Sequence, residues 1–180
     1  TRTIFLGKEA TAEQKELFSR VLKGHIAVAR CRFPAGTAGR QIDTLARMPL
    51  WEIGLNYNHG TGHGVGAFLN VHEGPQAIHP IRCTGVPLEQ GNILSNEPGF
   101  YKEGEYGIRI ENIEMVTATD SNDYLSFKTL TMFPMEQKLI DENLLSNTEK
   151  NWINNYHQEI YNNLSPFLSE DLKTWLKNKL

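Results

Sequence analysis

Three of the six histidines and five of the fifteen glycines fall within residues 57–74, which read YNHGTGHGVGAFLNVHEG. A strand interior loses stability at each glycine, so the glycines beside His59 and His63 indicate that something comes close to the backbone. On one extended strand these two side chains point the same way, about 13 Å apart. A single metal ion cannot bind both, so one histidine could be a ligand while the other contacts a substrate. The alternative is that both are solvated loop residues.

Two later segments carry glutamates among apolar residues, and they read NILSNEPGFY and YGIRIENIEMV. Both are predicted as strands, with Glu97 in the first and Glu111 in the second, on the same face as Arg109. A buried glutamate is costly unless it is paired or bound to a metal. One histidine and two carboxylates suit Mn²⁺, Zn²⁺, Co²⁺ or Fe²⁺. The alternative is that Glu111 pairs with Arg109 or Arg82.

Four runs occur in order along the chain: HGTGHGVG, LNVHEGP, SNEPGFY and GIRIENI. Together they resemble the catalytic domain of aminopeptidase P, the Xaa-Pro aminopeptidases of the pita-bread metallopeptidases, which are related to prolidase, methionine aminopeptidase and creatinase. The tail KNWINNYH further resembles the large, three-domain cytosolic type. The resemblance covers nearly all of the chain.

The resemblance implies an α+β pita-bread fold, a curved antiparallel sheet with helices on its outer face. Residues 1–140 are expected to form the C-terminal part of the catalytic domain, and residues 141–180 a helical extension packed on it. The chain opens without Met on TRTIFLG, which predicts a strand entered midway in a protein truncated at its N-terminus. In the family, two metal-binding aspartates and a substrate-contacting histidine lie further upstream. The chain alone is therefore expected to fold but to be inactive.

The resemblance also assigns metal ligands. It makes His63 and Glu97 ligands of one ion and Glu111 a carboxylate that bridges two. Two divalent ions in such a site hold a hydroxide and clamp the scissile carbonyl, and Glu97 takes the proton of that water. The ligand types accept manganese, zinc and cobalt alike, and the resemblance favours manganese.

The remaining site residues follow from the same resemblance. His72 is expected to donate a hydrogen bond to the tetrahedral intermediate, and His59 to line the pocket for the substrate proline. Arg109 is expected to orient Glu111, and Tyr101 either faces the site or is an ordinary buried tyrosine. The implied reaction is release of the N-terminal residue from peptides whose second residue is proline. Two alternatives stay open: a prolidase-like dipeptidase and a non-catalytic pita-bread binding module.

Composition excludes several other classes of function. With 39% hydrophobic and 22% charged residues among 180, the chain predicts one well-cored domain. A net charge of −3 gives no basic footprint for nucleic acid, and no apolar run reaches the ~18 residues of a membrane span. Cys31 and Cys83 lie in no metal or redox pattern and are expected to be reduced, as in the cytoplasm. The resemblance adds a homodimer.

Helical signals flank the predicted sheet. Thr11 and Gln14 predict a capping box for a helix to about Arg30, and a second helix is expected from about Ala38, with a kink at Pro49. His25, in the first helix, is expected to be an ordinary, partly exposed histidine. The C-terminal part predicts an amphipathic helix and then a short helix capped by Ser169. Aromatic residues at this spacing are more often core than interface, although the resemblance links this tail to dimer contacts.

The predicted strands span about 92–97, 106–117 and 124–133. Residues 70–87 are expected to form a loop, with His72 at its start and His79 as a solvated turn residue. The economical arrangement is an antiparallel sheet with two helices on one face.

Overall fold

The computed structural model describes residues 1–81, 85–121 and 123–180. The described residues form helices and strands in an α+β arrangement, as predicted. The α-helices are α1 (Ala12–Ala29), α2 (Gly39–Trp51), α3 (Asn147–Leu164) and α4 (Glu170–Lys177). The strands are β1 (Arg32–Pro34), β2 (Gly62–His63), β3 (Ala77–Ile78), β4 (Ile93–Asn96), β5 (Gly99–Lys102), β6 (Tyr106–Arg109), β7 (Asn112–Ala118) and β8 (Tyr124–Thr129). Short 3₁₀ turns, η1 (Gln137–Leu139), η2 (Glu142–Leu144) and η3 (Ser165–Phe167), flank α3.

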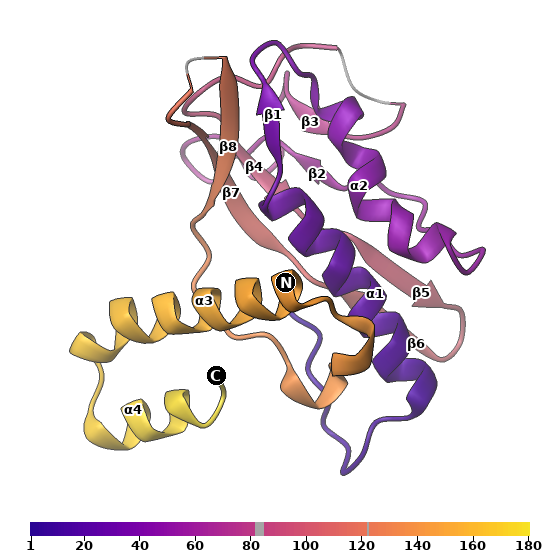
Figure 1. Cartoon of the computed structure of the whole chain (residues 1–180), viewed down its shortest axis with the longest axis vertical. Helices are drawn as coiled ribbons and strands as arrows, with labels where there is room; N and C mark the ends of the chain where they lie inside the picture. Colours follow the sequence, from indigo (N-terminus) through magenta and orange to yellow (C-terminus); the bar gives the residue numbers. More distant parts are fainter. Residues whose placement is uncertain (82–84, 122) are drawn as a thin grey trace.

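The main sheet is antiparallel, with strand order β1-β8-β7-β4. Two further antiparallel pairs, β2 with β3 and β5 with β6, adjoin it. Figure 1 shows α1 and α2 side by side across one face of these strands, with α3 and α4 beyond one end. The predicted antiparallel sheet with two helices on one face is confirmed.

Helix α1 begins and packs as its sequence indicates. The Thr11 hydroxyl accepts from the Gln14 backbone, and the Gln14 side chain accepts from the Thr11 backbone, so the predicted capping box is present. Gly24 lets α2 come close, because a Cβ on Gly24 would lie 2.1 Å from the Ala46 carbonyl oxygen. The close crossing seals a core between α1, α2 and the main sheet.

Two apolar cores lie on the helix-covered side of the sheet. One joins the C-terminal end of α1 and α2 to the main sheet, and includes Val28, Ile42, Leu94 and Val116. The other joins α1 to the β5–β6 hairpin and the C-terminal helices: Phe18, Leu22, Ile26, Phe100, Ile108, Ile153, Ile160 and Leu176. Residues 141–180 thus pack on the rest of the chain through a shared core. The domain boundary after residue 140 stays a prediction.

The expectation of a partly exposed His25 is wrong. Its side chain is fully buried, its Nδ1 lies 3.1 Å from the Asn96 carbonyl oxygen, and burial lowers its pKa to about 3. The Trp152 ring of α3 packs edge-to-face with the imidazole, with 6.0 Å between the ring centroids, so α3 covers His25. The sequence of α1 alone could not show that His25 is covered, because α3 begins more than 120 residues after it.

The prediction that TRTIFLG is a strand is also wrong, since residues 1–6 form no strand in the described structure. Instead, the side chain of Thr3 bonds to the backbone of Arg109, the last residue of β6. Its Oγ1 accepts from the Arg109 N–H at 2.9 Å and donates to the Arg109 carbonyl at 3.2 Å. These side-chain bonds and one backbone bond, from the Glu111 N–H to the Thr1 carbonyl at 3.0 Å, hold the segment without a regular ladder.

The predicted strand over residues 106–117 is two strands. β6 pairs with β5, whereas β7 pairs with β4 and β8, so the chain changes partners around Glu111. The predicted third strand ends at Thr129 rather than near residue 133. β1 and β5 were not predicted as separate strands. No helix in the described part of the chain is both long and apolar enough to cross a membrane.

Candidate metal centre

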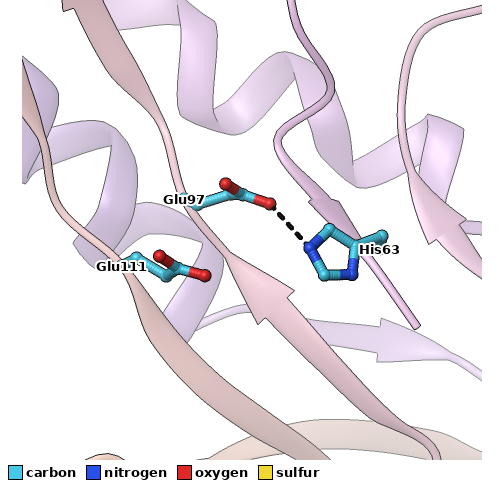
Figure 2. Close-up of side chains that lie close together, drawn as sticks. All are labelled: His63, Glu97 and Glu111. Carbon is cyan, nitrogen blue, oxygen red and sulfur yellow. Dashed lines mark ion pairs between the residues drawn. The ribbon is translucent and has the colours of Figure 1, made fainter. Parts of the chain in front are cut away.

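Both glutamates lie where two neighbouring strands leave the main sheet for the β5–β6 hairpin. Asn96 is opposite Asn112 in the main sheet, and Gly99 is opposite Arg109 in the hairpin. Glu97 and Glu111 therefore occupy the switch between these two registers. The pleat carries both side chains to one side, toward His63 at the end of β2 (Figure 2).

His63, Glu97 and Glu111 each offer one ligand atom, and these atoms all lie within 4.8 Å of one another. The His63 Nε2 lies 3.1 Å from Glu97 Oε1, and Figure 2 shows both carboxylates turned toward the imidazole. The structure thus brings together the three residues that the sequence proposed as ligands.

The backbone fixes which nitrogen of His63 can bind a metal. Nδ1 lies 3.0 Å from the Gly64 carbonyl oxygen, which only accepts, so in the neutral ring Nδ1 carries the proton. The lone pair of Nε2 then faces the Glu97 carboxylate, another acceptor. A proton or a metal ion can join two acceptors at this distance, and the set of one imidazole and two carboxylates fits a divalent ion.

Ser95 ties these two ligands together. Its Oγ accepts from the His63 backbone N–H at 3.0 Å and donates to Glu97 Oε1 at 3.0 Å. The Glu97 N–H in turn donates to the Thr61 carbonyl at 2.7 Å. Metal-ligating carboxylates are commonly held by such bonds. The sequence analysis missed Ser95, although its place two residues before Glu97 on a strand puts it on the same face.

Glycine at position 62 makes room for this arrangement. A Cβ on Gly62 would lie 1.9 Å from the Ser95 carbonyl oxygen, so the close approach inferred from the glycines is that of a neighbouring backbone. The extended strand expected through His59 and His63 is wrong. Strand pairing is confined to Gly62–His63, and His59 lies in the turn before it.

Glu111 is held by the first residue of the chain. The Thr1 hydroxyl and amino group both donate to its Oε2, the amino group at 3.0 Å. Burial acts to raise the pKa of Glu111, but the hydrogen bonds from Thr1 and the charge of the amino group and Arg109 outweigh it and lower the pKa. Glu111 is thus stabilised as a carboxylate.

His59 joins the site through a directed chain of hydrogen bonds. Burial lowers its pKa, which favours the neutral ring, and Nδ1 donates to the Gly60 carbonyl at 2.7 Å. Nε2 is then an acceptor, so the Tyr101 hydroxyl donates to it at 2.8 Å. Arg109 Nε donates to the Tyr101 oxygen at 2.9 Å. Tyr101 is half-exposed and faces the site, which decides between the two interpretations of this tyrosine.

Arg109 lies nearest to Glu97 rather than to the glutamate that it was expected to orient. Its Nη1 is 3.8 Å from Glu97 Oε2. It acts on Glu111 only through its charge, which helps to lower the pKa of that glutamate. The turn of the chain between β6 and β7 separates Arg109 and Glu111, which a continuous strand would have kept on one face. Arg82, the other suggested partner of Glu111, lies outside the described residues.

His72 approaches the centre from an exposed loop. Its ring lies 4.2 Å from that of His63, centroid to centroid. The loop between them carries Phe68 and Leu69 with positive φ angles of 53° and 65°. His79 lies just after β3, with its ring against Gly60 and its Nδ1 accepting from the Ile81 N–H. His72 is therefore beside the candidate ligands, whereas His79 packs behind the turn that carries His59.

Comparison with known proteins identifies the class. Residues 1–118 match the model of metallopeptidase family M24, and residues 123–180 match the model of the C-terminal region of peptidase M24. The chain belongs to metallopeptidase family M24.

Two curated relatives match along nearly the whole chain. The probable Xaa-Pro aminopeptidase P of Botryotinia fuckeliana is 49% identical over 189 residues, which cover 100% of this chain and 29% of the relative. Aminopeptidase P2 of Arabidopsis thaliana is 48% identical, with 99% of this chain and 26% of the relative covered. The chain thus spans less than a third of the length of these relatives.

Solved structures show the same fold. An X-prolyl aminopeptidase from Caenorhabditis elegans, described as a cytosolic enzyme with a di-nuclear active site, matches with a TM-score of 0.90 and 40% identity. That match covers 96% of this chain and 29% of the other. A Xaa-Pro dipeptidase from Bacillus anthracis matches with a TM-score of 0.63 and 31% identity, over 75% of this chain and 35% of the other. The expected pita-bread fold is confirmed.

Proposed function

We propose that this chain supplies His63, Glu97 and Glu111 to the metal centre of an aminopeptidase that removes the N-terminal residue from Xaa-Pro peptides. The observation that carries the proposal is the meeting of three ligand atoms within 4.8 Å, with His63 Nδ1 directed to the Gly64 carbonyl and Nε2 directed to the Glu97 carboxylate. The relatives named Xaa-Pro aminopeptidases and the di-nuclear site of the C. elegans enzyme support it. The family resemblance adds two aspartates from a segment that would precede Thr1.

His63, Glu97 and Glu111 would hold divalent ions at this site together with the two aspartates that the resemblance adds. Such ions, when bound, polarise the scissile carbonyl and lower the pKa of water. Imidazole nitrogen and carboxylate oxygen accept manganese, zinc and cobalt, and the family resemblance leads us to propose manganese. The Thr1 hydroxyl and Ser95 hold the carboxylates in place through the bonds described above.

The remaining side chains bind the peptide and move one proton. Glu97 accepts the proton of the attacking water at a carboxylate oxygen, and Arg109 Nη1 lies 3.8 Å from its Oε2. His72 donates a hydrogen bond to the oxygen on which charge develops. His59, held neutral and oriented by Tyr101, lines the pocket for the substrate proline.

Two wider expectations belong to the same proposal. We place the protein in the cytoplasm, which the description of the C. elegans relative as cytosolic supports. We also propose a homodimer, on the family resemblance alone.

The second candidate is a prolidase-like dipeptidase, which the similarity to the B. anthracis Xaa-Pro dipeptidase favours. Against it stands the match of residues 123–180 to the C-terminal region of peptidase M24, together with the higher TM-score of 0.90 to the X-prolyl aminopeptidase. A non-catalytic binding module is the third. The convergence of all three candidate ligands argues against it.

Peptide length separates these candidates. The test uses a long form, defined as this chain joined to the segment that the resemblance places before Thr1. With Mn²⁺, the long form is expected to hydrolyse an Xaa-Pro-Xaa tripeptide and to lose this activity in a chelator. Activity confined to Xaa-Pro dipeptides would make it a prolidase, and no turnover of either would make it a binding module. The chain alone in millimolar Mn²⁺ is expected to show no turnover, because two ligands are lacking.

A further inference from the structure

Asp43 and Arg47 form an ion pair on α2 that is buried beside the histidine segment. Arg47 Nε lies 2.6 Å from Asp43 Oδ2, and the two side chains are only 4% and 2% exposed. A second bond, of 3.2 Å, joins Arg47 Nη2 to Asp43 Oδ1. Buried charges of this kind are costly, so a pair of them away from the candidate ligands needs a reason.

The guanidinium uses its other donors on the turn that carries His59. Nη2 donates to the His59 carbonyl at 2.8 Å, and Nη1 donates to the Tyr57 carbonyl at 2.7 Å and the Asn56 side chain at 3.0 Å. With the two bonds to Asp43, all five N–H donors of Arg47 are used. The guanidinium also lies 4.1 Å from the centre of the Tyr57 ring, which packs on the His59 ring. Arg47 thus binds this turn at Asn56, Tyr57 and His59.

Asp43 adds a hydrogen bond to Thr61, which lies two residues before His63. Its Oδ1 accepts from the Thr61 hydroxyl at 2.7 Å. Because the single proton of Thr61 goes to the carboxylate, the Tyr57 hydroxyl must donate to Thr61 Oγ1, at 2.5 Å. The Thr61 carbonyl accepts from the Glu97 N–H. Thr61 is therefore bound on one side to α2 and on the other to the backbone of a candidate ligand.

We propose that Asp43 and Arg47 are positioning residues, a clamp through which α2 fixes His59 directly and His63 and Glu97 by way of Thr61. That the clamp serves a metal centre rests on the proposed function. That it fixes the positions of the imidazole rings is a separate claim. The clamp acts on backbone carbonyls and one hydroxyl. A change of these two residues should therefore alter the site with no change in its ligands.

The test replaces both charges at once, because removal of one would leave the other buried and unpaired. In the double variant Asp43→Leu/Arg47→Met the pair becomes apolar at similar volume, which such sites commonly tolerate. Lys23→Met is the matched control, since it breaks a half-buried pair with Glu149, 2.9 Å apart, that joins α1 to α3. Folding of each 180-residue variant is checked by its thermal unfolding.

Two readouts then report on position rather than stability. In ¹H–¹⁵N spectra of the imidazoles, the unmodified chain is expected to show His59 and His63 with the proton on Nδ1, and the double variant a mixture of tautomers at His59. Affinity for Mn²⁺ alone is expected to fall about 10- to 100-fold in the double variant, the range typical of outer partners of metal ligands. Lys23→Met is expected to change neither. Unmodified histidine spectra and Mn²⁺ affinity in a folded double variant would overturn the clamp.

Thr61→Val provides the same test if the double variant does not fold. It keeps the charges and the shape but removes the link from Asp43 to Tyr57, and a fall in Mn²⁺ affinity of about 10-fold is expected. An affinity equal to that of the unmodified chain would overturn the proposal. If the unmodified chain bound no Mn²⁺ because two ligands are lacking, the affinities would be compared in the long form, and the imidazole spectra would still decide on the clamp. A long form that bound no Mn²⁺ would put the proposed function at fault.

Discussion

Strands β4 and β7 carry polar side chains on both of their faces. The ligand face, which we define as His63, Ser95, Glu97 and Glu111, opens toward β2. The helix face, which we define as Asn96, Asn112 and Glu114 together with His25 of α1, is fully buried. Each face has a histidine and at least one glutamate, and consecutive residues such as Asn96 and Glu97 belong to opposite faces.

The two faces differ in the groups that their hydrogen-bond acceptors contact. On the ligand face, His63 Nε2 and the carboxylates point at one another, so they are arranged for a cation. On the helix face, His25 Nδ1 donates to the Asn96 carbonyl, and the Asn96 amide donates to the His25 carbonyl. The same residue types are therefore arranged for a cation on one face and join a helix to the sheet on the other, according to the pleat that presents them.

The largest expected effect is that of His63→Ala in the long form. Loss of this ligand is expected to remove one metal ion and to lower turnover by more than the about 10- to 100-fold typical of an outer partner. His79→Ala is the control, because its ring lies behind the His59 turn. Elemental analysis of both variants decides, and equal metal content would remove His63 from the ligand face.

The helix face is expected to make the free energy of unfolding depend on pH, through Glu114. Burial raises the pKa of Glu114 from 4.5 to about 7, and Thr129, Asn96 and the charge of Arg2 offset burial only in part. The folded state then holds this proton more tightly than the unfolded state. Stability that is present below pH ~4.5 is therefore lost as the pH rises to about 7, by about 3 kcal/mol.

Glu114→Gln is expected to remove this contribution, while Glu159→Gln, at an exposed position, is expected to leave it. The measurement is the free energy of unfolding by denaturant between pH 4.5 and 7.5, as the difference between each variant and the unmodified chain. This difference isolates Glu114 from the buried histidines, whose lowered pKa values act in the opposite direction. A pH-independent difference for Glu114→Gln would contradict the raised pKa.

His72→Ala tests how far the ligand face extends. In the long form it is expected to lower kcat by about 10²-fold, the scale for one oxyanion donor, because the lost bond is stronger in the transition state. Metal content should stay unchanged, although the ring lies 4.2 Å from that of His63. A rise in KM alone would make His72 a residue that only binds the peptide.

The smallest effect is expected where the C-terminal helices meet the helix face. The Tyr156 hydroxyl accepts from Arg2 at 2.8 Å and donates to the Thr131 carbonyl at 2.9 Å. Tyr156→Phe is expected to cost about 1–2 kcal/mol of unfolding free energy and to leave metal content unchanged. A loss of metal would show that the two faces are coupled through Arg2.

Local patterns predicted the first helix well. The capping box of Thr11 depends on neighbours in the sequence, and the structure bears it out. The partner switch at Glu111 could not be predicted in this way, because it depends on which strand lies opposite. His25 was misjudged for the same reason, since its cover comes from α3.

The Asp43–Arg47 clamp shows a further limit of sequence patterns. A pair four residues apart on a helix is usually a solvated ion pair, and the pattern carries no sign that the turn after α2 folds back over it. The burial that distinguishes this pair appears only with the tertiary structure.

The loop between His63 and His72 makes the chain cleavable beside its own site. Phe68 is fully exposed and Leu69 is 94% exposed, both with positive φ, so an aromatic-specific protease can reach the bond between them. A single cut there would leave residues 1–68 and 69–180 joined only by their packing. The two histidines whose rings now touch would then belong to separate polypeptides. The mass of these two fragments, and whether they stay together, would measure how much of the site the peptide bond itself maintains.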